Sequence, residues 1–240
     1  MLDEVVERAY DVFSRYVVDV PLDVCTVCCL TAEEEVRLAR TPVRGIPVEL
    51  LADYTDSARP EKTRIDEVKH FLPRYLELVS QFVFPTHSAE LSFSRLSPFD
   101  KDEWSEEEQD VLGSFAVEFF TRCLATYPLP EGIDTILIML NKGGFAIEPL
   151  LDIWETTNGL MSTLNFTDLY VESFDFTKSR LTNAFDEDGK TSGVLAAWFD
   201  DDQVKSTFRE RIENAVMGGI VHDEKSIEKL SFLYEMMSPR

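Results

Sequence analysis

The sequence lacks any hydrophobic run of the roughly 18 residues that a membrane-spanning helix needs. Its opening residues, MLDE, also lack the basic stretch and apolar core of a secretion signal. Cysteine is scarce: the 240 residues contain four, and three of them fall within residues 25–29. Cysteines placed in this way make a poor disulfide framework, so we expect the chain to reside in the reducing cytoplasm.

Basic residues are few compared with acidic ones. The chain has 23 Lys and Arg against 45 Asp and Glu, a net charge of −22, and the halves carry about −13 and about −9. A surface of this sign repels nucleic acid and anionic lipid and attracts cationic proteins. We therefore expect a basic protein partner, without nucleic-acid or membrane binding. The alternative is that the charge serves only to keep the protein soluble.

Recognisable catalytic and nucleotide-binding motifs are missing. The sequence contains no G-x-S-x-G, H-E-x-x-H or G-x-G-x-x-G motif. Gly189-Lys190-Thr191 fails as a phosphate loop because Ala184 replaces its first glycine, and with Leu195 at the twelfth position the segment also fails as a calcium loop. The three histidines are scattered singly. We expect a protein that is not an enzyme, with no catalytic residues, no metal and no cofactor.

Apolar residues recur at helical spacing along most of the chain. The clearest stripe runs from Val111 to Tyr127, for more than four turns. Further stripes lie at residues 5–17, 65–79, 133–140, 147–154, 204–216 and 227–234. Alternating apolar residues are confined to short pieces near 91–93 and 169–176. The pattern predicts an all-α fold, a single compact domain over residues 1–240 with about nine or ten helices, at most minor β content and a potential subdivision near residues 127–132.

Helix boundaries are marked by capping and breaking residues. Thr31 with Glu34 and Ser105 with Glu108 match the reciprocal capping box, so helices should begin at both places. Pro73 interrupts an apolar stripe and is expected to kink that helix or divide it in two. Stop signals lie at Pro42, Tyr127–Pro130, Gly143-Gly144, Asn158-Gly159 and Gly218-Gly219.

The cysteine cluster CTVCC, with Cys25, Cys28 and Cys29, is open to three interpretations. Structural zinc needs four ligands, but Cys123 lies on an apolar stripe and the histidines show no paired spacing. A thioredoxin-type redox pair needs a preceding strand, which the pattern does not supply. Core-facing thiols before a capped helix are the simplest interpretation. The alternative is a metal- or thiol-dependent protein that uses these cysteines, with His70 as a further ligand.

Two acidic regions each contain or adjoin a large aromatic residue, Trp104 or Trp198. Stabilisation of the helix dipole accounts for part of this acidity, in the first turn after the Ser105 cap and in the matching place before Val204. A binding surface for a cationic partner is the functional interpretation. The alternative for both tryptophans is a place in the core. The candidate partner-binding residues are Asp100, Asp102, Glu103, Trp104, Glu106, Glu107 and Asp110 in the first region, and Asp186, Glu187, Asp188, Asp200, Asp201 and Asp202 in the second.

Several segments together resemble one family. They are CxxCC at 25–29, TPVR at 41–44, Tyr54 with Ser57-Ala58, and EVKHFLPRYLEL at 67–78. These segments resemble an uncharacterised family of small bacterial cytoplasmic proteins, whose members look like the immunity partners of Rhs-type polymorphic toxins. The similarity covers residues 20–80 well and the remainder loosely.

The resemblance implies a protein that binds a cognate secreted toxin domain and covers its active site. It supplies no catalytic residues. Toxins that act on nucleic acids tend to be basic because they approach phosphates, which fits the acidity of this chain. A helical scaffold for a non-toxin partner is the remaining alternative.

Overall fold

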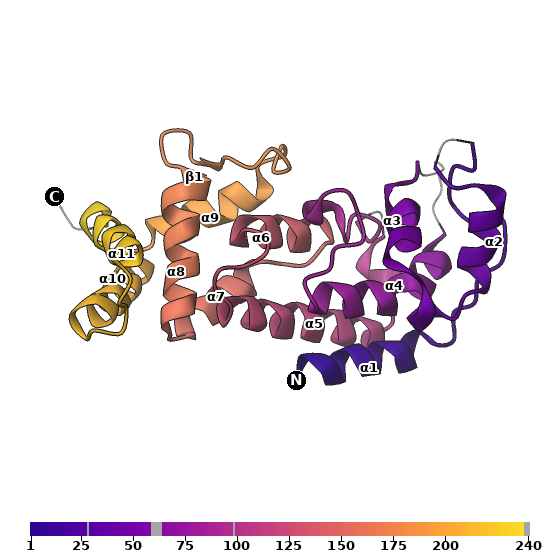
Figure 1. Ribbon diagram of the computed structural model, residues 1–240, viewed down its shortest axis with the longest axis horizontal. Coiled ribbons are helices and arrows are strands. Elements are labelled where there is room, and N and C mark those ends of the chain that lie inside the picture. Colours follow the sequence, from indigo (N-terminus) through magenta and orange to yellow (C-terminus); the bar gives the residue numbers. More distant parts are fainter. Residues whose placement is uncertain (28, 59–63, 98, 238–240) are drawn as a thin grey trace. The chain divides into compact units, whose positions relative to one another are not determined.

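The computed structural model describes residues 1–27, 29–58, 64–97 and 99–237. Within these ranges the chain forms eleven α-helices, and the only sheet is a two-stranded antiparallel ribbon (Figure 1). The predicted all-α fold class is confirmed. No helix in the described ranges is both long and apolar enough to cross a bilayer.

The chain divides into two compact units. Unit 1 consists of Met1–Phe119 and Lys142–Phe145, and unit 2 of Phe120–Asn141 and Ala146–Arg240. The first boundary falls inside helix α5 (Glu106–Leu124), the helix predicted from the apolar stripe that begins at Val111. The single domain with a subdivision near residues 127–132 stays a prediction.

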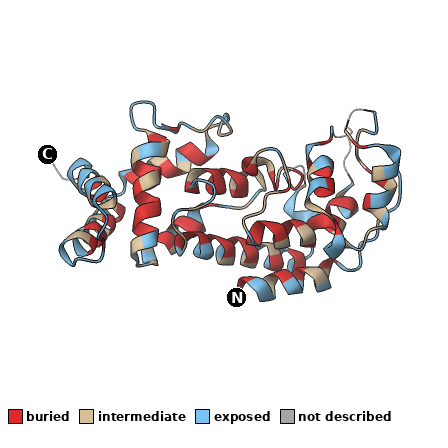
Figure 2. Ribbon diagram, viewed as in Figure 1, coloured by how far each residue is buried: buried red, intermediate tan, exposed pale blue. Residues whose placement is uncertain are grey.

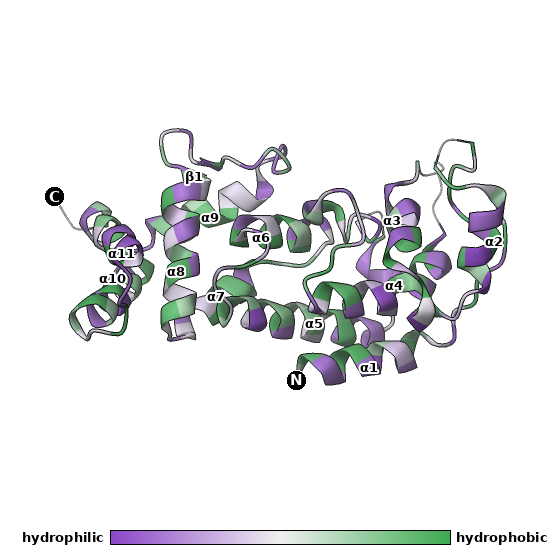
Figure 3. Cartoon of the chain, in the orientation of Figure 1, coloured by the Kyte–Doolittle hydropathy of each residue, from purple (hydrophilic) through white to green (hydrophobic). Residues whose placement is uncertain are grey.

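Unit 1 is built around the packing of its first helix against its longest complete one. Its helices are α1 (Leu2–Phe13), α2 (Ala32–Arg40), α3 (Val48–Asp56), α4 (Ile65–Ser80) and the first part of α5. Helix α1 lies along α4 and buries Leu2, Val6, Ala9 and Phe13, which share one face at helical spacing. The same alternation of buried and exposed faces is visible on the other helices (Figure 2), and it follows their hydropathy (Figure 3).

Helix α4 runs through Pro73 without being divided, so of the two expected effects of this residue only a kink stays a prediction. A proline inside a helix removes one main-chain hydrogen bond and costs about 3 kcal/mol. Most of α4 is buried, including Pro73 itself. Apolar packing on several sides therefore offsets the local cost, which the sequence pattern alone does not reveal.

Both predicted capping boxes are present. The Glu34 amide donates to Thr31 Oγ1 at 3.2 Å and the Thr31 amide donates to Glu34 Oε2 at 2.8 Å. Ser105 and Glu108 repeat the arrangement at 3.3 and 2.9 Å. Helices α2 and α5 therefore begin where the sequence predicts.

The helices of unit 2 pack around a cluster of aromatic rings. These helices are α6 (Ile133–Lys142), α7 (Glu148–Thr156), α8 (Leu160–Asp168), α9 (Lys190–Asp200), α10 (Asp202–Met217) and α11 (Glu224–Met236). A π-helical turn, Leu169–Ser173, connects α8 to strand β1 (Phe174–Asp175), which pairs with β2 (Arg180–Leu181). Helix α10 contacts α7, α8, α9 and α11, and Phe166 and Phe208 stack at 3.6 Å between ring centroids in the cluster.

Candidate functional site

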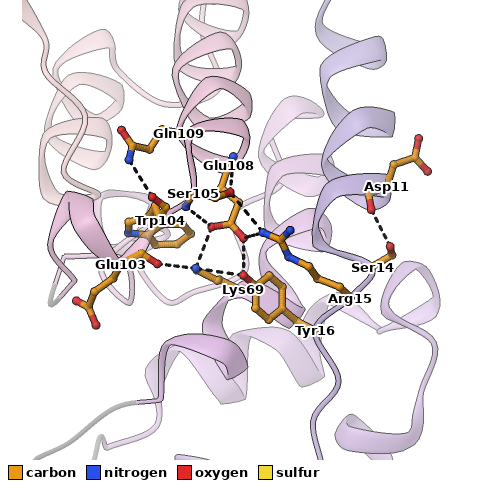
Figure 4. A network of polar contacts seen from close by, with 10 residues as sticks. All are labelled: Asp11, Ser14, Arg15, Tyr16, Lys69, Glu103, Trp104, Ser105, Glu108 and Gln109. Carbon is orange, nitrogen blue, oxygen red and sulfur yellow. Dashed lines mark hydrogen bonds and ion pairs between the residues drawn. The ribbon is translucent and has the colours of Figure 1, made fainter.

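The start of α5 is fixed by a buried carboxylate, that of Glu108 (Figure 4). Its side chain is 0% exposed, and donors from three parts of unit 1 converge on it. Arg15 Nη2 and the Tyr16 hydroxyl lie 2.5 Å from Oε1, and Lys69 Nζ lies 2.9 Å from Oε2. Together with the Ser105 amide of the capping box, these donors satisfy both carboxylate oxygens.

The network keeps Glu108 ionised. Burial acts to raise the pKa of the Glu108 carboxyl, but hydrogen bonds from Tyr16, Lys69, Ser105 and Arg15 outweigh burial and lower this pKa to about 2. The Lys69 amine also donates to the Glu103 carbonyl at 2.7 Å. A buried ion pair of this kind is retained only where its remaining hydrogen bonds are satisfied, as they are here.

Trp104, a candidate partner-binding residue, belongs to the interior of unit 1. Its indole is buried, with edge contacts to Phe13 at 6.4 Å and to Phe99 at 6.5 Å between ring centroids. The Lys69 amine lies over it at 4.9 Å from the ring. The indole therefore covers the ion pair beneath it, and its faces are not accessible to a partner in this structure.

The carboxylates of the first acidic region lie at the surface, in contrast to Glu108. Glu103 accepts from the Asp100 amide at 3.0 Å, and Asp110 pairs with Arg8 at 2.5 Å. Asp102, Glu106 and Glu107 are exposed, and no ion pair with another described residue holds them. The candidate carboxylates of this region are therefore exposed, whereas Glu108 in the same segment is buried; these candidates are Asp100, Asp102, Glu103, Glu106, Glu107 and Asp110.

Three carboxylates of the second acidic region have local structural roles. Asp186 accepts from the amides of Thr191 and Ser192 at 3.1 and 2.9 Å, which satisfies the first turn of α9. Asp201 caps α10 by accepting from the Gln203 amide at 2.7 Å. Asp188 forms an exposed ion pair with Lys190 at 2.9 Å. The cap by Asp201 adds to the helix-dipole stabilisation that the sequence predicts before Val204.

The rest of this region is open to solvent but does not form one cluster. Glu187 is exposed, and the carboxylates of Asp200 and Asp202 are almost fully exposed, each 3.6 Å from Lys205 Nζ. Residues 186–188 precede α9 whereas residues 200–202 lie at its C-terminal end, so about 16 Å of helix separates the two groups. Trp198 is buried in the aromatic cluster and donates through Nε1 to Glu155 at 2.5 Å.

Beside Asp200 and Asp202, the surface of unit 2 is hollowed. Two hollows of about 560 and 480 Å³ share Tyr170 and Lys205, so they adjoin. We call the pair the aromatic groove. It is lined by Tyr170, Phe174, Phe176, Ser179, Ala196, Ala197, Phe199, Asp200 and Lys205 in the larger hollow, and by Tyr170, Asp202, Lys205, Ser206, Arg209, Met236 and Met237 in the smaller.

Phe176 is the exposed tip of the groove's aromatic wall. The residue is 40% exposed, and its ring centroid lies 4.4, 4.9 and 5.7 Å from those of Tyr170, Phe174 and Phe199, all three of which are buried. The residue begins the turn between β1 and β2, and Ser179 in that turn has φ of +50°. A non-glycine residue in this region of φ stores strain, which is found most often at functional positions.

Phe176, Tyr170 and Lys205 are not among the candidate residues predicted from the sequence. The alternation of apolar residues near 169–176 is typical of a strand, but Leu169–Ser173 forms a π-helical turn and strand β1 covers only Phe174–Asp175, so this pattern did not indicate which side chains line the groove. The information that this segment meets the end of α9 and the start of α10 comes only from the tertiary structure.

The cysteine cluster is described only in part, because Cys28 lies outside the described residues. Cys25 and Cys29 are half-buried, and Cys123 is buried, which raises the pKa of its thiol. His70 Nδ1 lies 2.7 Å from the Tyr16 carbonyl oxygen, and burial lowers the pKa of this imidazole. In the described ranges no three His, Cys, Asp or Glu side chains are placed to hold a metal ion. The interpretation of Cys25, Cys28 and Cys29 as core-facing thiols stays a prediction, as does the alternative of a metal or thiol site formed by them.

No family model matches the sequence, and neither the curated proteins nor the solved structures include a significant match to it. The resemblance to immunity proteins of Rhs-type toxins therefore stays a prediction. A functional proposal depends on the charge and geometry of the two units.

Proposed function

We propose that this protein is an immunity protein, which neutralises a basic toxin domain by docking acidic surfaces over its active site. The observation that carries the proposal is that the first turn of α5 is held rigidly while it exposes two glutamates. The first turn of this helix is fixed from the interior by the four donors to Glu108, while Glu106 and Glu107 in the same turn face solvent. Because the backbone of this turn is already ordered, a partner can bind these charges at little cost in backbone conformational entropy.

The overall charge supports the same partner class. A net charge of −22 raises the encounter rate with a cationic protein, by roughly 10- to 1,000-fold at low ionic strength. The same negative charge repels nucleic acid. A basic toxin would bind its nucleic-acid substrate in a cationic groove, and an acidic protein can bind in that groove as well. Carboxylates carried on the fixed first turn of α5 are therefore suited to occupy a groove built for phosphates.

The direct test is co-expression with the product of the neighbouring reading frame. The proposal requires that growth is restored in cells that express a lethal neighbour, and that the purified pair forms a complex whose association slows as salt is added. A scaffold for a non-toxin partner would bind without restoring growth. Failure to restore growth against any neighbouring gene product would end the proposal.

A pair of charge reversals tests the surface itself. E106K/E107K should lower the association rate constant by about tenfold at low ionic strength and flatten its salt dependence. The matched control is E33K/E49K, which reverses two exposed glutamates in the first turns of α2 and α3 of the same unit. Both pairs carry the same charge change and a similar helix-dipole cost. Equal effects of the two pairs would show that only net charge matters.

A further inference from the structure

The aromatic groove of unit 2 presents a rigid apolar surface that the fold of the unit leaves open. Phe176 remains 40% exposed although three buried rings surround it, so its outer face is held in one position without being covered. Large aromatic side chains that are fixed in this way are the usual anchors of protein interfaces. The larger hollow, about 560 Å³, extends from Phe176 to Asp200.

The accessible charge at this end of the groove is negative. The Asp200 carboxylate is 94% exposed, and the neighbouring Asp201 and Asp202 are exposed as well. Two cations also line the groove, Lys205 in both hollows and Arg209 in the smaller one. The Lys205 side chain is only 28% exposed and its amine donates to the Asp200 carbonyl at 2.8 Å, while the Arg209 guanidinium lies over the Tyr234 ring at 4.9 Å. An incoming group therefore meets the aspartate oxygens before it meets the lysine.

These features favour a cationic occupant. A second copy of the chain is disfavoured because each copy carries a net charge of −22. Among cations, a guanidinium is planar, stacks on aromatic faces and pairs with a carboxylate through two parallel hydrogen bonds, whereas an ammonium is a compact and strongly hydrated charge. Arginines already lie over rings elsewhere in this protein, as Arg44 does over Tyr10 at 3.9 Å.

We infer that the aromatic groove receives an arginine side chain from a basic segment of the partner, with the guanidinium stacked on Phe176 and paired with Asp200. The inference rests on the proposed function and adds a second contact region on unit 2. It assigns the apolar anchor of the complex to Phe176, and the steering of association to the carboxylates of α5.

The groove is tested on the full-length ¹⁵N-labelled protein with a defined probe, the acetylated and amidated peptide GRGRG. Amide shifts at residues 174–179 and 196–205 should saturate with a Kd of about 1 mM, as expected for one exposed stacking contact and one ion pair. The same peptide with citrulline in place of arginine should bind about fivefold more weakly, because citrulline is planar but uncharged.

Two substitutions separate the stacking contact from the ion pair. F176L keeps an apolar side chain but removes the ring face, and D200N removes the charge at nearly constant size; each should weaken GRGRG binding about three- to fivefold. D152N, at an exposed position of α7 in the same unit, is the matched control and should leave binding unchanged.

The outcomes also separate this inference from the proposed function. Absence of shifts in the groove at several times the expected Kd, about 5 mM peptide, would overturn the arginine site. Tighter binding of the peptide GLGLG would overturn it as well, in favour of an apolar occupant. Either result would leave neutralisation of a toxin by the α5 surface intact. Conversely, groove binding without restored growth would contradict the function and not the site.

Discussion

Lys69 on α4 and Glu108 on α5 form an ion pair of 2.9 Å in which the side chains are only 5% and 0% exposed. Charges removed from water to this extent are retained only with complete hydrogen bonding, which Tyr16, Arg15 and the Ser105 amide provide. The pair thus ties α4 to the turn of α5 that displays Glu106 and Glu107. Its integrity is a condition for the proposed binding surface.

Removal of the lysine should destabilise unit 1 strongly. K69M leaves the Glu108 carboxylate buried without its lysine partner, and we expect the free energy of unfolding to fall by about 3–5 kcal/mol. The measurement is native-state amide hydrogen exchange in α4 as a function of urea. R8M breaks the exposed pair between Arg8 and Asp110 and serves as the control, with an expected loss of about 0–1 kcal/mol. Equal losses in the two variants would contradict the role assigned to Lys69.

Glu108 should also make unit 1 sensitive to acid. Its pKa is lowered from 4.5 to about 2 in the folded protein, so the stabilisation is fully present above the unfolded pKa and is lost as pH falls through the folded one. We expect the free energy of unfolding to decrease by about 3 kcal/mol between pH 5 and pH 2 from this group alone. In E108Q this component should vanish. A pH profile of E108Q parallel to that of the wild type would show that other groups dominate.

Two glycines should respond to alanine substitution with opposite signs. Gly113 lies on the exposed side of α5 with no atom within 4 Å of an added Cβ, so G113A should stabilise by about 0.5–1 kcal/mol. At Gly143 an added Cβ would lie 2.7 Å from the Phe93 Cβ and 3.0 Å from the Phe145 ring. G143A should therefore destabilise, by about 1–3 kcal/mol. Urea denaturation of both variants tests the packing at the end of α6, and stabilisation by G143A would refute it.

In the acidic loop before α9, substitution of Asp186 should lower stability, whereas substitution of its neighbour Glu187 should not. D186A removes the acceptor for the amides of Thr191 and Ser192 and should cost about 0.5–2 kcal/mol. E187A changes an exposed neighbour and should stay within about 0.5 kcal/mol of the wild type. Hydrogen exchange in the first turn of α9 measures both. Equal protection of these amides from exchange in the two variants would contradict the capping role of Asp186.

The helices were predictable because their signals are local. The apolar stripe from Val111 to Tyr127 and the capping box at Ser105 and Glu108 both lie within the segment that forms α5. Pro73 shows the limit of local signals, since burial of α4 offsets a defect that would end an isolated helix. The cost of the proline is a local property, whereas the compensation comes from contacts distant in sequence.

For the candidate sites, the sequence showed which segments are rich in carboxylates but not which side chains are exposed. The density of carboxylates at residues 100–110 is plain in the sequence, but their division is not: Glu108 is buried whereas its neighbour Glu107 is exposed. Trp104, for which the sequence leaves both a binding role and a core position open, is buried, while Phe176, which is not among the candidate residues, is exposed. Burial of a single side chain depends on the elements that pack against it, and these come from distant parts of the chain.

By itself the sequence determined that this protein is helical and strongly acidic, because helical periodicity, capping and charge are properties of neighbouring residues. Only the tertiary structure decided that Lys69 forms an ion pair with Glu108 and that Phe176 and Asp200 line the same hollow. The physical reason is that ion pairs and apolar contacts gain their strength from exclusion of water, and water is excluded only where distant segments pack together.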